Sequence, residues 1–279
     1  MRFSPLRIRA FREKIFSWWE WNKRDLPWRM TRDPYRVWIS EVMLQQTQVD
    51  RVVPKYEAFL YFFPDVWTLS QAPLSKVIRA WHGLGYNRRA LHIRNAARVI
   101  VRDYRGDLPA DEQLLMILPG VGRYTARAIL VFAHGVRTSL VDTNIRRIIT
   151  HFFFRDVPQK PAVIEETAEM LLPDEKVWEW HQALMDYGAL EMKKTRLRRQ
   201  VKGKRKTKER QVPFRESNRF FRGRIIDRLR DRSAQESALI GDLISRYGKT
   251  DGYYRTLLRD LAKEGLITKS SRGIVSLPE

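Results

Sequence analysis

The sequence of 279 residues contains no cysteine. This absence excludes disulfide bonds, zinc sites built from thiolates and iron–sulfur clusters held by cysteine. Long hydrophobic runs are also missing, and no signal-peptide core is visible, so neither a membrane span nor secretion is expected. The absence of targeting signals predicts a cytoplasmic protein.

Acidic side chains are far outnumbered by basic ones. The chain has 32 Asp and Glu against 53 Lys and Arg, which gives a net charge of +21. An excess of this size suits a polyanionic partner, with nucleic acid favoured over an anionic membrane surface. The Arg-rich start resembles a transit peptide in composition, yet Phe11, Ile15, Trp18 and Trp19 recur at helical spacing. This start is therefore predicted to form the first helix of the fold.

Three parts of different composition follow one another along the chain. Residues 1–192 show repeated helical periodicity with little strand-type alternation, which predicts a mainly α domain. Residues 193–213 are predicted to be a solvated linker, since 193–210 holds eleven basic side chains and one acidic side chain. Residues 214–279 combine three helical stretches with two short strands around a Ser-Ser-Arg-Gly turn. This pattern predicts a winged helix with residues 252–265 as recognition helix, the alternative being a small helical appendage.

A glycine-rich turn opens directly onto a helical stretch in residues 118–129, LPGVGRYTARAI. Gly120 and Gly122 would let an anion approach the backbone without meeting a Cβ. The helix that follows would present free N–H groups and the positive end of its dipole. With the helical stretch EQLLMI before it, the segment predicts a helix-hairpin-helix that binds a phosphate of nucleic acid. The alternative is an ordinary turn between two helices.

Two carboxylates stand out in apolar or basic surroundings. Glu41 lies in a helical stretch among apolar residues, where burial would raise its pKa and suit it as a general acid. Asp142 lies in SLVDTNIRRII, where it would either cap the next helix or be held against a ligand. A protonated and an ionised carboxyl group together are the pattern for breaking a glycosidic bond. The alternative is a surface Glu and a capping Asp with no shared role.

Several motifs occur together in one order. They are RDLPWR, DPYRVWISEVMLQQTQV, HGLGYNRRA, LPGVGRYTARAI, VDTNIRRI and HQALMDYGAL. Through these motifs, residues 11 to about 190 resemble the helix-hairpin-helix DNA glycosylase superfamily, in particular the MutY-type adenine DNA glycosylases. The resemblance implies a mainly α, two-lobed catalytic domain whose active site lies in the cleft between the lobes. It also implies that the target nucleotide is flipped out of the duplex into that cleft.

The resemblance assigns four catalytic positions. Glu41 matches the general acid that protonates the adenine ring, and Asp142 matches the carboxylate that stabilises the sugar cation and supports attack by water. Asn144 matches the asparagine that helps to hold that water and the carboxylate. Tyr124 stands where bifunctional relatives carry a nucleophilic lysine, and because tyrosine forms no Schiff base, a monofunctional enzyme is implied.

The resemblance also assigns contacts to DNA and to the flipped base. Gln46 and Tyr86 match side chains that wedge into the helix beside the opposing base. Trp28 and Arg29 match residues that line the base pocket, although any one of nine tryptophans more often belongs to a hydrophobic core. The phosphate-binding hairpin would comprise Gly120, Val121, Gly122 and Arg123.

Three features depart from the family pattern. MutY relatives usually carry four cysteines that bind an iron–sulfur cluster, whereas this chain has none and is expected to be a member without the cluster. We expect the basic run 193–210 to contact the DNA backbone in place of the cluster loop. The C-terminal part resembles a winged helix in place of the usual domain that recognises 8-oxoguanine. Thr143 stands after the catalytic Asp142, where the family usually has glycine.

The sequence therefore predicts a monofunctional DNA glycosylase of base excision repair that removes adenine mispaired with G or 8-oxoguanine. It would act as a nucleoid-associated monomer on double-stranded DNA containing the mispaired or damaged base, without cofactor or metal. Thymine-mismatch glycosylases of the same superfamily also pair Tyr with Asp, so a thymine or uracil glycosylase is the first alternative. The second is a non-catalytic DNA-binding protein on the same fold.

Overall fold

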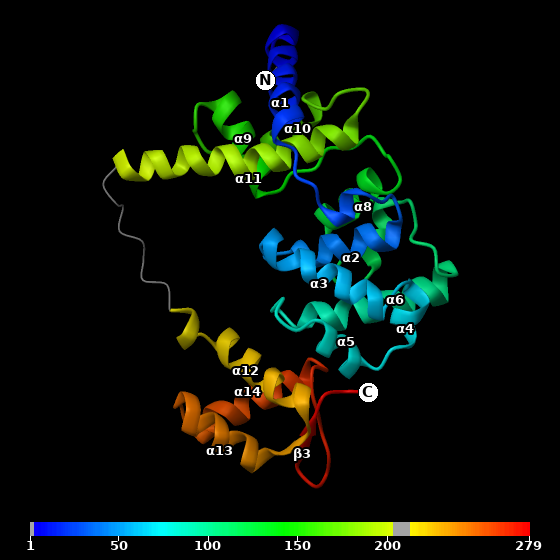
Figure 1. Cartoon of the computed structure of the whole chain (residues 1–279), viewed down its shortest axis with the longest axis vertical. Helices are drawn as coiled ribbons and strands as arrows, with labels where there is room; N and C mark the ends of the chain where they lie inside the picture. Colours follow the sequence, from blue (N-terminus) through cyan, green and yellow to red (C-terminus); the bar gives the residue numbers. More distant parts are fainter. Residues whose placement is uncertain (1–2, 203–212) are drawn as a thin grey trace. The chain divides into compact units, whose positions relative to one another are not determined.

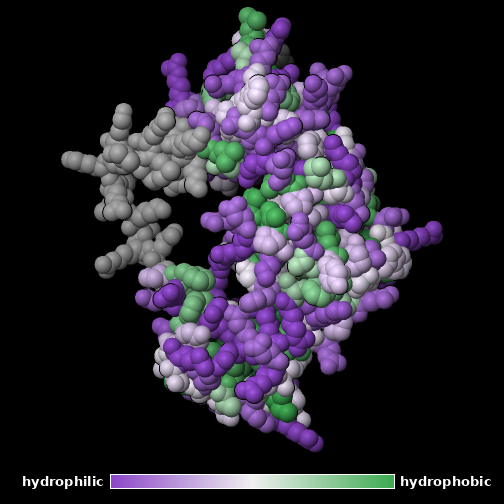
Figure 2. All heavy atoms as spheres, viewed as in Figure 1, coloured by the Kyte–Doolittle hydropathy of each residue, from purple (hydrophilic) through white to green (hydrophobic). Residues whose placement is uncertain are grey.

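The computed structural model describes residues 3–202 and 213–279, and between 193 and 202 it describes the course of the helix but not the side chains. Helices dominate these residues, and the three short strands all lie in the C-terminal region (Figure 1). None of the described helices is long and apolar enough to span a bilayer. On the face drawn in Figure 2, hydrophilic side chains predominate and apolar ones are scattered.

The chain forms two compact units. The first unit comprises Met1–Trp38, Ala110–Met116 and Val121–Thr207. The second unit comprises Ile39–Pro109, Ile117–Gly120 and Lys208–Glu279. Helix α2 (Pro34–Leu44) begins in the first unit and ends in the second.

The first unit is built from helices that enclose an aromatic and aliphatic core. Its elements are α1 (Pro5–Asn22), η1 (Pro27–Arg29), most of α7 (Glu112–Ile117), α8 (Arg123–Phe132), α9 (Thr143–Phe154), α10 (Pro161–Met170) and α11 (Val177–Lys202). Phe11 of α1 packs edge-on against Phe153 of α9 at 5.0 Å and against Trp180 of α11 at 5.8 Å between ring centroids. Helix α1 therefore belongs to the fold, as its apolar spacing predicts, because Phe11 and Ile15 are buried in this core.

The second unit contains the end of α2 and a set of helices that follow it in sequence. These are α3 (Val49–Phe62), α4 (Val66–Gln71), α5 (Leu74–Ala80) and α6 (Arg88–Tyr104). Their core includes Phe59, Phe63 and Trp81, which are fully buried. Helix α6 packs against both α4 and α5. The mainly α prediction for this region is therefore correct.

The C-terminal region, which we call the C-terminal domain (213–279), has the element order of a winged helix. It consists of η2 (Phe214–Glu216), α12 (Asn218–Asp231), β1 (Ala234–Gln235), α13 (Glu236–Tyr247), α14 (Asp251–Lys263), β2 (Thr268–Lys269) and β3 (Ile274–Ser276). The strands form one antiparallel sheet of order β1-β3-β2, in which Ala234 pairs with Val275 and Thr268 pairs with Ser276. The turn of the wing ends at Gly273, whose φ of +74° favours glycine. The sequence pattern did not indicate β1.

The domain boundaries differ from those expected from composition. The C-terminal domain belongs to the same compact unit as α3–α6. Arg79 at the end of α5 donates from Nε to the Arg230 carbonyl at 2.8 Å, and the amide of Ser75 donates to the Pro278 carbonyl at 2.7 Å. The region from 1 to 192 is in turn divided between the two units.

The basic run 193–210 also differs in part from the expected linker. Helix α11 continues to Lys202, because Lys, Arg, Leu and Gln are good helix formers even where their side chains are expected to face water. Residues 203–210 lie outside the described residues, as do the side chains of residues 193–202. The expected contact of this run with the DNA backbone therefore stays a prediction.

Candidate active site

Asp142 caps the first turn of α9 in the first unit. Its Oδ1 accepts a hydrogen bond from the Ile145 amide at 2.7 Å, and its Oδ2 accepts one from Nδ2 of Asn144 at 3.0 Å. Burial raises the pKa of Asp142, and the hydrogen bonds together with the charge of Arg147 oppose that rise. The two interpretations of Asp142, as a helix cap and as a carboxylate available to a ligand, are therefore compatible. One of its oxygens caps the helix, while Asn144 orients the other.

Asn144 is held close to α11 by a glycine that the sequence analysis did not single out. A Cβ on Gly188 would lie 2.5 Å from Cβ of Asn144 and 3.3 Å from its Cα. Only a residue without a side chain lets the first turn of α9 approach α11 so closely. Gly188 belongs to the quoted motif HQALMDYGAL, and a glycine in the middle of a long helix is the signal that would have identified it.

Tyr124 lies in the first turn of α8, whose N-cap is Gly122. Its ring packs against the edge of the first unit's core. A Cβ on Gly122 would meet no atom within 4 Å, so the free amide end of α8 is open on that side. Val121 is buried, so that only its backbone is available to a phosphate. Arg123 forms exposed ion pairs with Glu112 and Glu165, each at 3.2 Å.

Gly120, in the second unit, has a structural reason to be glycine that does not involve a ligand. Its φ is +80°, and an added Cβ would lie 2.8 Å from Cβ of His92. The helices predicted on both sides of the turn are present as α7 and α8. Of the two glycines, Gly122 is the one whose missing side chain leaves open space. Phosphate binding by this turn stays a prediction.

Trp28 and Arg29 lie in η1, and both are buried. Arg29 donates from Nη1 and Nη2 to the two carboxylate oxygens of Asp186 on α11, each at 2.8 Å. Arg24 pairs with the same carboxylate at 2.6 Å. Burial raises the pKa of Asp186, but the hydrogen bonds and charges of these arginines outweigh it and lower the pKa overall. Arg29 therefore fastens η1 to α11, which also fixes the neighbouring Trp28.

Glu41 lies on α2 in the second unit and is 7% exposed. Its neighbours along the helix include Trp38, Val42 and Met43, which are buried. The expected burial of Glu41 is therefore confirmed, and its role as general acid stays a prediction. The pairing of Glu41 with Asp142 joins residues of different units and stays a prediction.

Gln46 and Tyr86, the two predicted wedge residues, share an unusual backbone conformation. Their φ angles are +55° and +47°, in the left-handed region that side-chain-bearing residues rarely adopt. Such strain persists only where surrounding contacts enforce it, and it is concentrated at functional sites. Gln46 is exposed and Tyr86 is half-buried.

Arg89 enforces both conformations, and no pattern in the sequence indicated this role. The buried guanidinium donates to the Gln45 carbonyl at 2.8 Å and to the Gly85 carbonyl at 3.1 Å, which directly precede the two wedge residues. It donates further to the carbonyls of Val42, Met43 and Leu84 and to Oγ1 of Thr47. Burial lowers the pKa of Arg89 to about 10, which still leaves it charged at neutral pH. Arg89 thus acts as a positioning residue for the Gln46 and Tyr86 segments.

The structure brings some predicted residues together and separates others between units. Asp142, Asn144 and Tyr124 belong to the first unit, and Asp142 and Asn144 are in direct contact. Among the residues that the structure describes, no group of three or more His, Cys, Asp or Glu side chains has the arrangement of a metal site.

Comparison with known proteins places this geometry in a family. A model of the HhH-GPD superfamily of base excision DNA repair proteins matches residues 39–174. The chain is 36% identical over 184 residues to an adenine DNA glycosylase of Buchnera aphidicola, a match that covers 65% of this chain and 52% of that protein. The chain thus spans about half the length of that relative.

Two further comparisons involve glycosylases that are named for thymine. A thymine/uracil-DNA glycosylase of Methanothermobacter thermautotrophicus is 32% identical over 186 residues, which cover 65% of this chain and 84% of that protein. The solved structure of a thermostable thymine-DNA glycosylase has a TM-score of 0.62 and 30% identity, over 66% of this chain and 87% of that one. The fold of the matched region is therefore that of these enzymes.

Proposed function

Because the chain belongs to the HhH-GPD superfamily of base excision DNA repair proteins, we propose that it is a monofunctional DNA glycosylase that removes adenine mispaired with guanine or 8-oxoguanine. It acts as a monomer on duplex DNA of the nucleoid, in the cytoplasm. The observation that carries the proposal is the carboxylate of Asp142, oriented by Asn144 at the first turn of α9.

The reaction breaks the bond between the base and C1′ of the deoxyribose and adds the elements of water. Glu41 donates a proton to a ring nitrogen of adenine, which makes the base a better leaving group. The sugar develops oxocarbenium character, and the ionised carboxylate of Asp142 stabilises that positive charge. Water then attacks C1′ and loses a proton, so that the products are free adenine and an abasic site.

Asn144 and Tyr124 complete the proposal. Asn144 donates to one oxygen of Asp142, which leaves the carboxylate fixed in orientation while its charge is stabilised. Tyr124 has no amine with which to form a Schiff base, so the strand is not cut in the same event. This hydrolysis needs no metal or redox cofactor.

A second candidate is a thymine or uracil mismatch glycosylase. It is supported by the thymine/uracil-DNA glycosylase relative, of which the chain covers 84%. Thr143, which follows Asp142 in place of the glycine usual in MutY relatives, also favours it. The chemistry at Asp142 is the same in both candidates, and they differ only in the base that is expelled.

Single-turnover base release on a panel of short duplexes distinguishes the candidates. The panel contains A opposite 8-oxoguanine, G or C, and T or U opposite G, each read with and without alkali. Alkali-dependent cleavage of the adenine strand supports the first candidate, and cleavage at T or U supports the second. Release from none of the duplexes contradicts both.

Asp142→Asn tests the assigned chemistry. The variant keeps the size and the helix cap but loses the negative charge, so we expect base release to fall by about a thousandfold or more while DNA affinity is retained. Undiminished base release would refute the assigned role of Asp142.

A further inference from the structure

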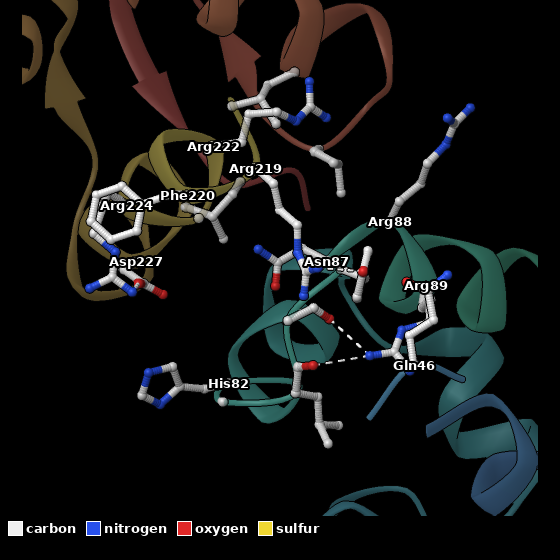
Figure 3. Close-up of a pocket in the computed structure, with 18 of the residues that line it drawn as sticks. Gln46, His82, Asn87, Arg88, Arg89, Arg219, Phe220, Arg222, Arg224 and Asp227 are labelled. Atoms are coloured by element: carbon white, nitrogen blue, oxygen red, sulfur yellow. Dashed lines mark hydrogen bonds and ion pairs between the residues drawn. The ribbon is translucent and has the colours of Figure 1, made fainter. Parts of the chain in front are cut away.

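The C-terminal domain and the wedge segments together form a large cavity within the second unit. Its volume is about 720 Å³. One wall includes Gln46, Tyr86 and Arg88, and the other includes Arg219 and Gly223 of α12. Figure 3 shows Arg219 extending from α12 toward the loop at Asn87, with Arg88 projecting from the start of α6.

The cavity is strongly basic. Seven arginines line it against two carboxylates, Asp227 and Glu264. Both carboxylates are already paired, Glu264 with Arg222 at 2.6 Å and Asp227 with Arg224 at 2.6 Å and with Arg230. Three exposed arginines remain around the opening, namely Arg51, Arg88 and Arg219. This charge favours a ligand with several phosphates.

Arg219 is coupled to the wedge tyrosine. Its guanidinium carbon lies 3.5 Å from the centroid of the Tyr86 ring and 5.4 Å from that of the Phe214 ring. Nη1 of Arg219 also donates to the Tyr86 hydroxyl. Guanidinium groups and aromatic rings stacked in this way are surfaces on which nucleobases stack and phosphates bind. The C-terminal domain therefore adds a cation directly beside a residue predicted to enter the DNA.

Gly223 leaves the backbone of α12 open on the side of the cavity. It lies in the middle of α12, four residues after Arg219, and lines the same cavity. Glycine weakens a helix interior, yet a Cβ at this position would meet no atom within 4 Å. No packing contact in the described protein requires glycine here, and its missing side chain leaves space for a ligand against the helix backbone. Gly241 on α13 is equally open but does not line the cavity.

We infer that this cavity binds the backbone of the DNA strand that carries the opposing base, and that α12 supplies the contact through Arg219 and Gly223. The inference rests on the proposed function for the identity of the DNA. It differs from the expectation that α14 is the DNA-reading helix. On α14, Arg255 is paired with Asp251 at 2.5 Å and with Glu236 at 3.6 Å, and Glu236 also pairs with Lys269 of the wing.

Two substitutions with matched controls test the inference. Gly223→Gln fills the open side of α12 without changing charge, and Gly241→Gln does the same on α13, where an added Cβ also meets no atom within 4 Å. Arg219→Gln removes one cation from the cavity, and Arg232→Gln removes one from an exposed position outside it. Affinity is measured by fluorescence anisotropy over a series of salt concentrations, on a duplex with A opposite 8-oxoguanine that carries a non-hydrolysable analogue of the adenosine.

We expect Gly223→Gln to weaken binding about tenfold while its melting temperature equals or exceeds that of the wild type. Arg219→Gln should weaken binding about fivefold and reduce the salt slope by about one. Both controls should stay within about twofold of the wild type. A melting temperature that is not lowered shows that the loss of affinity does not come from unfolding.

Three outcomes would overturn the inference. The first is unchanged affinity and salt slope for both Gly223→Gln and Arg219→Gln. The second is tighter binding by either variant, which would mean that the C-terminal domain obstructs the DNA. The third is a larger loss for Arg259→Gln on α14 than for Arg219→Gln. Because binding is read without chemistry, failure of the wild type to release any base would refute the proposed function and leave this test intact.

Discussion

The close approach of α9 to α11 makes Gly188→Ala the most informative single substitution. An added Cβ would lie 2.5 Å from Cβ of Asn144, a distance that folded proteins do not tolerate, and 3.3 Å from its Cα. Because the second contact is with the backbone, a change of side-chain rotamer cannot relieve it. The first turn of α9, which carries Asp142 and Asn144, must therefore move away from α11.

Two opposing terms set the magnitude of the effect on stability. Replacing glycine by alanine in a helix interior stabilises by about 0.5–1 kcal/mol. Overpacking a filled contact destabilises by about 1–3 kcal/mol. The second term exceeds the first over most of these ranges, so we expect a net loss of up to about 2.5 kcal/mol in the free energy of unfolding, measured by urea denaturation.

The effect on catalysis should be larger than the effect on stability. A displacement of about 1 Å at a positioned group can cost about a hundredfold in rate. We expect Gly188→Ala to slow single-turnover base release by about ten- to a hundredfold. DNA affinity should change little, since Gly188 lies outside the segments predicted to bind the DNA backbone.

Gly241→Ala is the control, since its Cβ would meet nothing within 4 Å. It should stabilise the protein by about 0.5–1 kcal/mol and leave base release unchanged. If Gly188→Ala proved as stable as Gly241→Ala and released base at the wild-type rate, the proposed dependence of Asp142 on this helix contact would be refuted.

Three further predictions concern buried polar groups away from the chemistry. Arg89→Met leaves several backbone carbonyls without a donor, so it should destabilise the protein by about 2–4 kcal/mol and weaken binding to mismatched duplexes. An unchanged melting temperature would contradict the role of Arg89 as a positioning residue. His181 donates to the Thr138 carbonyl, and burial lowers the pKa of His181 to about 4. Its contribution of about 3 kcal/mol to the free energy of unfolding is therefore complete above pH 6.5 and is lost as the pH falls toward 4. His181→Gln should flatten the dependence of stability on pH in that window, and an unchanged dependence would count against the burial argument. Asp186→Asn breaks the buried ion pair with Arg29 and should lower the free energy of unfolding by about 3–5 kcal/mol at pH 7. Because the pKa of Asp186 is lowered in the folded protein, the wild type loses this contribution only below about pH 4, where the two proteins should become equally stable in urea denaturation. A difference in stability that persisted below that pH would be evidence against the ion pair.

Local patterns along the chain were sufficient for most of the helices and for the three helices and the two-stranded wing of the C-terminal domain, but not for β1. Apolar residues at helical spacing predicted the first helix, and Phe11 and Ile15 are indeed buried. The turn Ser-Ser-Arg-Gly predicted the wing, because Gly273 has the positive φ that the turn needs. Each of these features depends on residues that are close in sequence.

The positioning residues required the tertiary structure. Arg89 follows Arg88 in a basic segment, and the sequence does not reveal that Arg88 is exposed while Arg89 is buried among backbone carbonyls. The partnership of Arg29 with Asp186 joins residues 157 positions apart. Pattern and propensity describe neighbours along the chain, so contacts of this kind lie beyond them.

The sequence by itself determined the helical class, the basic character and the carboxylate, asparagine and tyrosine positions on which the proposed chemistry rests. Only the tertiary structure decided that Gly188 lets Asn144 orient Asp142, and that α12 places Arg219 against Tyr86. The physical reason is that residue type fixes what chemistry a side chain can perform, whereas the packing of distant segments fixes which atoms it can reach.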